Sequence, residues 1–164
     1  LSCNTRMPSK GIIIKYDKNG NYIKDWIINN TFSNAHGIAI DKNDNIYVIA
    51  SQSSSITITN IFVFDSNGTL IRQLTNDSFT NNSIFKIALD KNNNIYCLTY
   101  GGPLPGNAIV HKYDNYGNSI TDFGSYGINK GQFSYAWGIT IDNDDNVYVT
   151  DGGLHRVEVF KPIK

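Results

Sequence analysis

The chain has 164 residues and carries 14 basic and 14 acidic residues, so its formal net charge is zero. That balance argues against a nucleic-acid partner, because proteins that neutralise phosphates carry a basic surplus. The apolar runs are strand-sized, far short of the roughly 18 residues that a membrane span needs. Aromatic residues make up 12% and charged residues 17% of the chain, which is typical of an all-β protein.

In chain order, an N-terminal tail (1–10) precedes a series of predicted hairpins that fills residues 11–164. Two hairpin types alternate, and each has a turn rich in Asn, Asp and Gly, the residues that tight turns favour. Strands are predicted at 13–17, 22–26, 37–41, 46–49, 61–65, 70–74, 86–90, 95–98, 109–114, 119–123, 138–142, 147–150 and 156–160.

These hairpins repeat with a period of about fifty residues. Asp41, Asp90 and Asp142 end equivalent strands and recur at intervals of 49 and 52 residues. Four short strands per period of this length predict the blade of a β-propeller. Counted A to D from the axis outward, the strands run C-D, A-B-C-D, A-B-C-D, A-B-C. We therefore expect an all-β protein with about three blades of four antiparallel strands.

The last copy resembles an NHL repeat. It has a Gly-Gln-Phe lead-in at 131–133, Gly-Ile-Thr-Ile-Asp at 138–142, Val-Tyr-Val-Thr-Asp at 147–151 and Arg-Val-Glu-Val-Phe at 156–160. The copies at 34–64 and 83–113 match in part, lacking the Arg and the second Asp. The usual Pro of the family is replaced by Ala35, Ile84 and Ala136. NHL propellers usually have six blades, so the resemblance implies half of a ring.

Two positions of this repeat carry structural expectations. Arg156 is expected to pair with Asp151 or with nearby carbonyls and so to tie strand C to strand B. Cys97 aligns with Val48 and Val149 of the other copies, so we expect it to be a buried apolar residue.

Recognition is predicted on one rim of the propeller. The A–B and C–D turns share a rim and are short and uniform, as hairpin geometry requires. The opposite rim carries long, unlike loops, and loops that differ on a repetitive scaffold are suited to binding. For each aromatic residue the alternative is a plug between blades. The candidate binding residues are Phe32, His36, Tyr100, Tyr126, Phe133, Tyr135 and Trp137.

His36 raises the question of a metal. It directly precedes the Gly of strand A, where lyases related to NHL proteins place a metal-binding His. Its counterparts are Phe85 and Trp137, so the ligand set is not repeated, and neither a metal site nor a cofactor is predicted. His36 and Trp137 are both expected near the axial opening, because each precedes an innermost strand.

Acidic turns offer a second metal candidate. The turns beginning at Asp17, Asp41 and Asp142 resemble half of a calcium loop, but no Glu follows at the required offset. Hairpin turn chemistry is the favoured explanation. No nucleophile–base motif, zinc-protease motif or phosphate loop is present in the sequence.

The sequence favours a non-catalytic scaffold that presents its long-loop rim to a protein or a glycan. A metal-dependent propeller lyase or hydrolase that uses His36 near the axial channel is the alternative. Two assemblies stay open: a homodimer that completes a six-bladed ring, and a subunit or fragment of a larger assembly. The compartment is undetermined, with a secreted or surface-exposed location slightly favoured.

Overall fold

The computed structural model describes residues 10–52, 55–75, 84–99 and 109–162. Within these ranges the chain forms thirteen strands and no helix, so no described helix could span a membrane. The strands are β1 (Ile12–Tyr16), β2 (Tyr22–Ile27), β3 (Phe32–Ile40), β4 (Ile46–Gln52), β5 (Ser55–Phe64), β6 (Leu70–Leu74), β7 (Ile84–Leu89), β8 (Ile95–Thr99), β9 (Val110–Tyr113), β10 (Ser119–Phe123), β11 (Ala136–Ile141), β12 (Val147–Asp151) and β13 (Arg156–Phe160).

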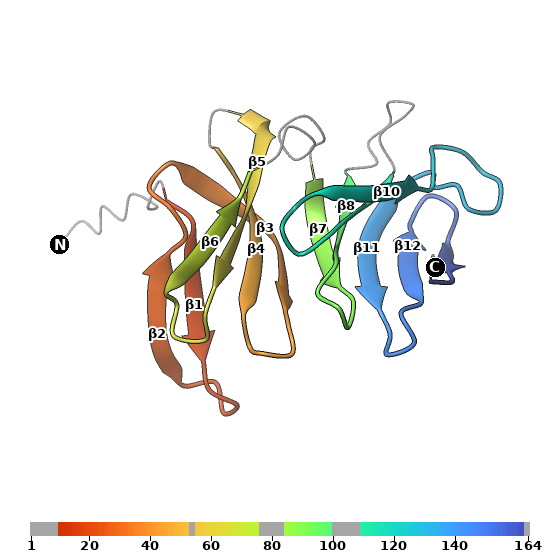
Figure 1. Ribbon diagram of the computed structural model, residues 1–164. Helices are drawn as coiled ribbons and strands as arrows, with labels where there is room; N and C mark the ends of the chain where they lie inside the picture. Colours follow the sequence, from red (N-terminus) through yellow and green to blue (C-terminus); the bar gives the residue numbers. More distant parts are fainter. Residues whose placement is uncertain (1–9, 53–54, 76–83, 100–108, 163–164) are drawn as a thin grey trace.

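The strands form four antiparallel sheets that stand side by side in an arc (Figure 1). We name them the half-blade (β1–β2), blade 1 (β3–β6), blade 2 (β7–β10) and blade 3 (β11–β13). The innermost strands adjoin one another, with β7 packed between β3 and β11. The predicted fold class and the predicted phasing of the strands are thereby confirmed: the chain is a partial β-propeller of about three blades.

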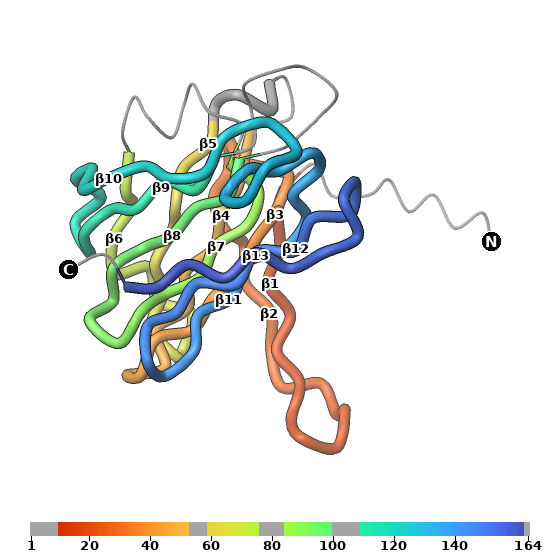
Figure 2. The backbone as a smooth tube through the Cα atoms, turned by 90° about the vertical axis from the view of Figure 1, so that its right-hand side faces the viewer, coloured from red at the N-terminus to blue at the C-terminus, as the bar shows by residue number. Residues whose placement is uncertain are grey.

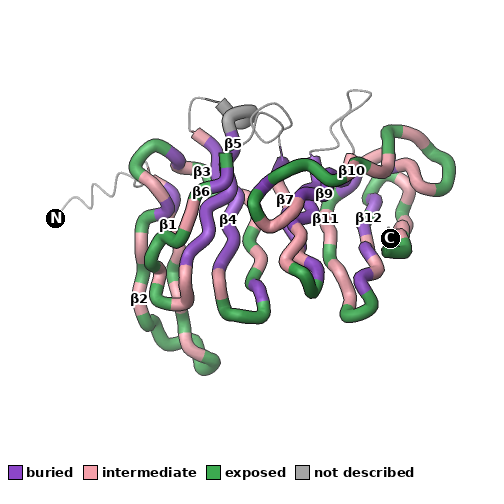
Figure 3. Tube along the Cα trace, in the orientation of Figure 1, coloured by how far each residue is buried: buried purple, intermediate pink, exposed green. Residues whose placement is uncertain are grey.

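The core lies between neighbouring blades, and blades 1 and 2 bury both faces, one against the preceding sheet and the other against the next. Between blades 1 and 2, Ile49 and Ile61 meet Ile95 and Cys97, and all four side chains are fully buried. Figure 3 shows that burial is concentrated on the middle strands. Cys97 is an apolar core residue, as expected, and its burial raises the pKa of the thiol.

The six short turns share one hydrogen-bonding pattern. In the turn at Asp41, the carboxylate accepts the backbone N–H groups of Asn43 (2.8 Å) and Asn45 (2.9 Å), and also the side-chain amide of Asn45 (2.9 Å). The fourth residue of every turn has a positive φ, which explains the Gly, Asn and Asp found there. These residues are Gly20, Asp44, Gly68, Asn93, Gly117 and Asp145.

This pattern confirms hairpin turn chemistry as the explanation of the aspartates. The inner turns also contact one another across the blades. Lys91 of blade 2 forms an ion pair with Asp145 of blade 3 (2.7 Å), and Asn93 donates to Asp41 of blade 1 (3.4 Å). The short-turn rim is therefore joined from blade to blade around the axis.

The half-blade is attached differently. Trp26 packs edge-on against Phe64 of blade 1, with ring centroids 6.1 Å apart. A Cβ atom on Gly68 would lie 2.6 Å from the Trp26 ring, so the turn of blade 1 needs a glycine there. Figure 2 shows that the β1–β2 hairpin extends beyond the neighbouring short turns.

Candidate functional site

Three aromatic side chains line a hollow of about 420 Å³ on the long-loop side of blade 3. Trp137 is 50% exposed and Tyr126 is 42% exposed. Tyr135 contacts Trp137 edge to face, with ring centroids 5.0 Å apart. We call Tyr126, Tyr135 and Trp137 the aromatic platform. Ser134, Gly152 and Gly153 complete the lining of the hollow.

A β-bulge presents Trp137. Ala136 pairs with Asp151 and Gly138 with Thr150, so Trp137 is the extra residue of β11. The same shift occurs at His36 in β3 and at Phe85 in β7. A bulge re-aims the side chain of its extra residue, so each blade offers one variable side chain from its innermost strand. The alternating sequence pattern did not reveal this bulge.

Two glycines allow the loop after β12 to lie close to the platform. A Cβ atom on Gly152 would stand 2.8 Å from Cδ1 of Trp137, and one on Gly153 would stand 2.7 Å from Oγ of Ser134. Both separations are shorter than real Cβ contacts, so any larger residue would displace the platform.

Asp151 links the loop after β12 to the residues that lead into β11, and it is 2% exposed. Its carboxylate accepts four backbone N–H groups, at 2.8–3.2 Å. Burial alone raises the pKa of this carboxyl, but the four N–H donors outweigh burial and leave the pKa below its ordinary value. The platform is thus fixed before any ligand arrives. The four donors belong to Ser134, Tyr135, Gly153 and Leu154.

Arg156 anchors the loop that leads into β11. Its guanidinium donates to the carbonyl oxygens of Ile128 (3.2 Å), Asn129 (2.6 Å) and Gln132 (2.8 Å), and it pairs with Glu158 at 2.8 Å. Nearby carbonyls were one of the two expected sets of partners. The expected tie between strands C and B is wrong, because the carboxylate of Asp151 is taken by backbone N–H groups.

Two predicted binding residues are core residues instead. Phe32 is 5% exposed and contacts Phe62, with centroids 5.1 Å apart, whereas Phe133 is fully buried against Phe160. Their side chains plug the contacts between blades, so neither is available to a ligand. Tyr100 lies outside the described residues.

His36 lies on innermost strand β3, as predicted, but in the middle of that strand rather than at its long-loop end. Its Nε2 atom is 2.8 Å from Oγ of Ser51. Burial, and then the charge of Lys86, lower the pKa of the imidazole, so it is neutral at pH 7. Within the described ranges, no three His, Cys, Asp or Glu residues are grouped so that they could hold a metal.

Comparison with known proteins agrees with this architecture. The NHL repeat family matches residues 133–160, which confirms the resemblance in blade 3. No curated protein was found to match the chain. Among solved structures, the major allergen Mala s 1 of Malassezia sympodialis is similar with a TM-score of 0.67 at 16% identity, over 95% of this chain and 55% of the allergen.

Two further structures have the same fold. A catalytically inactive virginiamycin B lyase from Staphylococcus aureus, solved with quinupristin, has a TM-score of 0.58 at 17% identity, over 93% of this chain and 49% of the lyase. The WD40 β-propeller domain of Doa1 has a TM-score of 0.54 at 16% identity, over 89% of this chain and 42% of the Doa1 chain. Identities this low show the fold alone.

The fold places this protein in the β-propeller class. The chain spans about half the length of the similar structures. In particular, it is a partial propeller whose last blade carries an NHL repeat.

Proposed function

We propose that this chain is a non-catalytic recognition module that binds a segment of a protein partner on the aromatic platform. The observation that carries the proposal is Trp137, half exposed on a β-bulge and packed against Tyr135. Trp and Tyr combine a large apolar surface with a polar tip, and they are the residues that most often dominate protein interfaces.

The surroundings of the platform suit a side chain that inserts between the rings. Aromatic, glycine and serine residues line the hollow of about 420 Å³, and none of the described residues that line it is charged. An apolar or aromatic side chain of the partner could therefore be buried there without leaving a buried charge unpaired. Because Asp151 already fixes the loop, binding requires little ordering of the site, and preorganisation of this kind favours affinity.

A selection from a random peptide library, followed by titration of the selected peptide, tests the proposal. Indole fluorescence and calorimetry would report binding. We expect Trp137→Ala to weaken binding by about tenfold or more, as for a hot-spot residue. Tyr116→Ala, at a 72% exposed aromatic on the short-turn rim, is the matched control and should bind as the wild type does.

The same experiment separates a glycan from a peptide. A panel of neutral oligosaccharides is titrated in parallel, since a sugar ring could also stack on the exposed indole. Binding of an oligosaccharide alone, or of neither probe, would contradict the proposal for a protein segment.

Metal analysis of the purified protein tests the enzymatic alternative. Stoichiometric zinc or calcium that is lost in His36→Ala would overturn the scaffold proposal, because a metal bound at this position of β3 would supply Lewis-acid chemistry.

A further inference from the structure

Equivalent apolar residues on the innermost strands differ sharply in exposure. Ile38 and Ile40 of β3 are 58% and 61% exposed. Their counterparts in β7 are covered by blade 1: Ile87 is 6% exposed and Leu89 packs against the core. The first pair is exposed because the half-blade before it has no strand A or strand B among the described residues.

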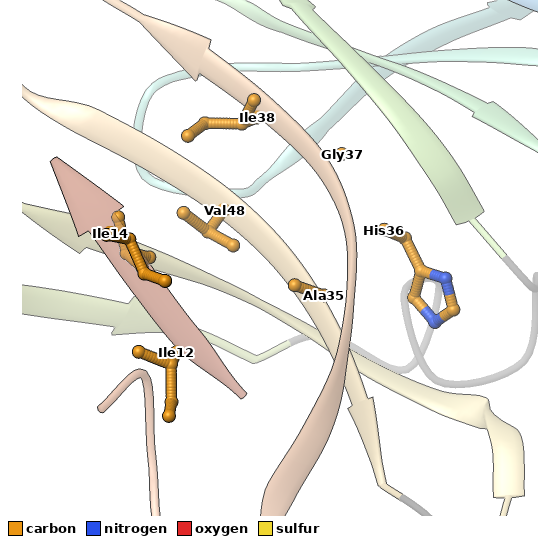
Figure 4. A pocket seen from close by; sticks show the side chains of 8 residues that line it. Ile12, Ile14, Ala35, His36, Gly37, Ile38 and Val48 are labelled. Atoms are coloured by element: carbon orange, nitrogen blue, oxygen red, sulfur yellow. The ribbon is translucent and has the colours of Figure 1, made fainter. Parts of the chain in front are cut away.

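The uncovered region forms a groove between β1 and β3. One hollow of about 260 Å³ is lined mainly by apolar side chains of these two strands, including Ile12, Ile14 and Ile38 (Figure 4). His36 of β3 also lines this hollow. A second hollow of about 440 Å³ continues past Ile40 toward Trp26. Isoleucines line most of the groove, and Lys15, Asp44 and Ser66 add polar groups to the second hollow.

The groove also has a free strand edge. In the described part of the chain, β1 pairs with β2 alone. In blades 1 and 2 the equivalent strands, β5 and β9, each pair on both edges. An open edge beside an apolar groove is a template for an added strand, and here the missing element is a two-stranded A–B hairpin.

The chain carries a matching hairpin at the other end of the arc. Gly37 of blade 1 lies against the next innermost strand, since a Cβ there would be 2.9 Å from the carbonyl oxygen of Phe85. Blade 3 keeps glycine at the equivalent Gly138, where Thr150 of its own sheet is the sole neighbour within 4 Å among the described residues. Lys86 takes this position in blade 2, which blade 3 follows, so a following blade does not require the glycine. The described residues leave the flank of β11 at Gly138 uncovered.

We propose that two copies of this chain associate head to tail, so that the β11–β12 hairpin of one copy fills the groove between β1 and β3 of the other. Tyr148 of that hairpin is equivalent to Tyr47 and Tyr96, which face the next blade in blades 1 and 2. The zero net charge imposes no overall repulsion between copies. Two copies together supply about the length of the similar propeller structures.

In the two-chain arrangement β13 of one copy and β1 of the other would both occupy position C beside β12, so one strand must replace the other. Within one chain β12 pairs with β13 at five positions, and β1 also has five residues. In the dimer, β12 would pair with β1 of the other copy instead of with β13 of its own chain. The ladder hydrogen bonds lost from β13 would be replaced by an equal number to β1. The driving force is the burial of Ile38, Ile40 and the inner side of β1.

The exchange of β13 for β1 withdraws Arg156 from the loop before β11 and Phe160 from Phe133. It leaves Asp151 of β12 bonded to Ser134 and to Tyr135 of the aromatic platform. Trp137 would lie beside β3 of the second copy, as Phe85 lies beside β11 within the chain. Phe85 is partly exposed although blades flank it on both sides, so a ligand could still reach the rim. The inference goes beyond the proposed function, and its test depends on mass and cross-linking alone.

Light scattering on the 164-residue chain is the first test. We expect a dimer, twice the 18.3 kDa of one chain, and a strictly monomeric species at about 100 µM would overturn the proposal. Ile40→Lys alters the groove and Tyr148→Lys alters the face of the β11–β12 hairpin, and both variants should be monomers. Ile120→Lys, at a 51% exposed site on β10, is the matched control and should stay dimeric.

Mixing the two monomeric variants tests the head-to-tail arrangement. Each variant retains one intact face, so the mixture should form heterodimers through a single interface. No heterodimer in the mixture would overturn the arrangement.

Disulfide cross-linking tests the exchange, in a Cys3→Ser background. Lys15 of β1 is the counterpart of Val159, which pairs with Tyr148. Tyr148→Cys with Lys15→Cys should form a covalent dimer, whereas Tyr148→Cys with Val159→Cys should lock β13 in place and give a monomer. A covalent monomer from the first pair, or a dimer from the second, would contradict the exchange.

Discussion

The two rims of this propeller are stabilised by different kinds of contact. On the short-turn rim each turn is closed by an aspartate that bonds groups two and four residues away. On the long-loop rim of blade 3, Asp151 and Arg156 bond backbone groups 16 to 28 residues away, in addition to the local N–H groups of Gly153 and Leu154 that Asp151 accepts. The comparison teaches that local contacts close each turn of the uniform rim, which inter-blade contacts such as Lys91–Asp145 then join, whereas non-local contacts to loop backbone shape the surface that differs between blades.

This difference between the two rims suits a binding protein. A turn that is closed by its own residues can be repeated in every blade without affecting its neighbours. A loop held by distant anchors takes a shape that belongs to one blade alone, and the platform of blade 3 is such a shape.

Acid should break both rims and have the largest effect. Hydrogen bonds from the turn asparagines hold the pKa values of Asp17, Asp114 and Asp142 below their usual range, and the backbone N–H of Thr69 does so for Asp65. A carboxyl with a lower pKa in the folded state stabilises the fold above its unfolded pKa of about 3.9 and loses this contribution as the pH falls through the folded value.

We therefore expect the free energy of unfolding to fall slightly between pH 7 and pH 5, because the fold lowers the pKa of His36, and to fall steeply below about pH 4 as the carboxylates are protonated. Urea unfolding followed by circular dichroism at a series of pH values measures it. A stability that is unchanged between pH 5 and pH 2.5 would refute the role assigned to these carboxylates.

Asp151→Asn should have the largest effect among single substitutions. The substitution removes a buried charge that accepts four backbone N–H groups. It also replaces one accepting oxygen with an NH₂ group, which cannot accept a hydrogen bond from them. We expect a loss of about 2–3 kcal/mol in the free energy of unfolding. Asp144→Asn, at an exposed turn position of the same blade, is the control and should change stability by less than about 0.5 kcal/mol.

Arg156→Lys should loosen the long-loop rim with a smaller loss. An ammonium group lacks the planar fork that reaches three carbonyls at once, so we expect a loss of about 1–2 kcal/mol. Proteolysis in the loop before β11 should also become faster than in the exposed control Lys130→Ala. Equal stability and equal cleavage in the two variants would show that the guanidinium fork is dispensable.

Gly20→Ala should produce the smallest effect and isolates backbone strain on the short-turn rim. Gly20 has φ of 84°, and no atom lies within 4 Å of a Cβ built there. The left-handed backbone therefore accounts for the whole expected loss of about 1 kcal/mol. The reverse change, Asp44→Gly at φ of 62°, should leave stability equal or slightly higher. Thermal unfolding of both variants checks the opposite signs.

The sequence by itself determined the strands, their phasing into blades and the chemistry of the six turns. These features depend on contacts within a few residues, such as the carboxylate of Asp41 bonding Asn43 and Asn45. The NHL resemblance of blade 3 and the burial of Cys97 were predictable for the same reason, because the repeat aligns each position with its counterparts.

Only the tertiary structure decided which aromatic residues are available to a ligand. Phe133 and Tyr135 are two residues apart, yet one fills the contact between blades 2 and 3 and the other forms the platform. Their roles depend on the neighbouring blade, on the bulge at Trp137 and on the anchor Asp151, and each of these joins segments far apart in sequence. Residue type and spacing do not encode such long-range packing, so the pattern alone selected Phe32 and Phe133 together with Trp137.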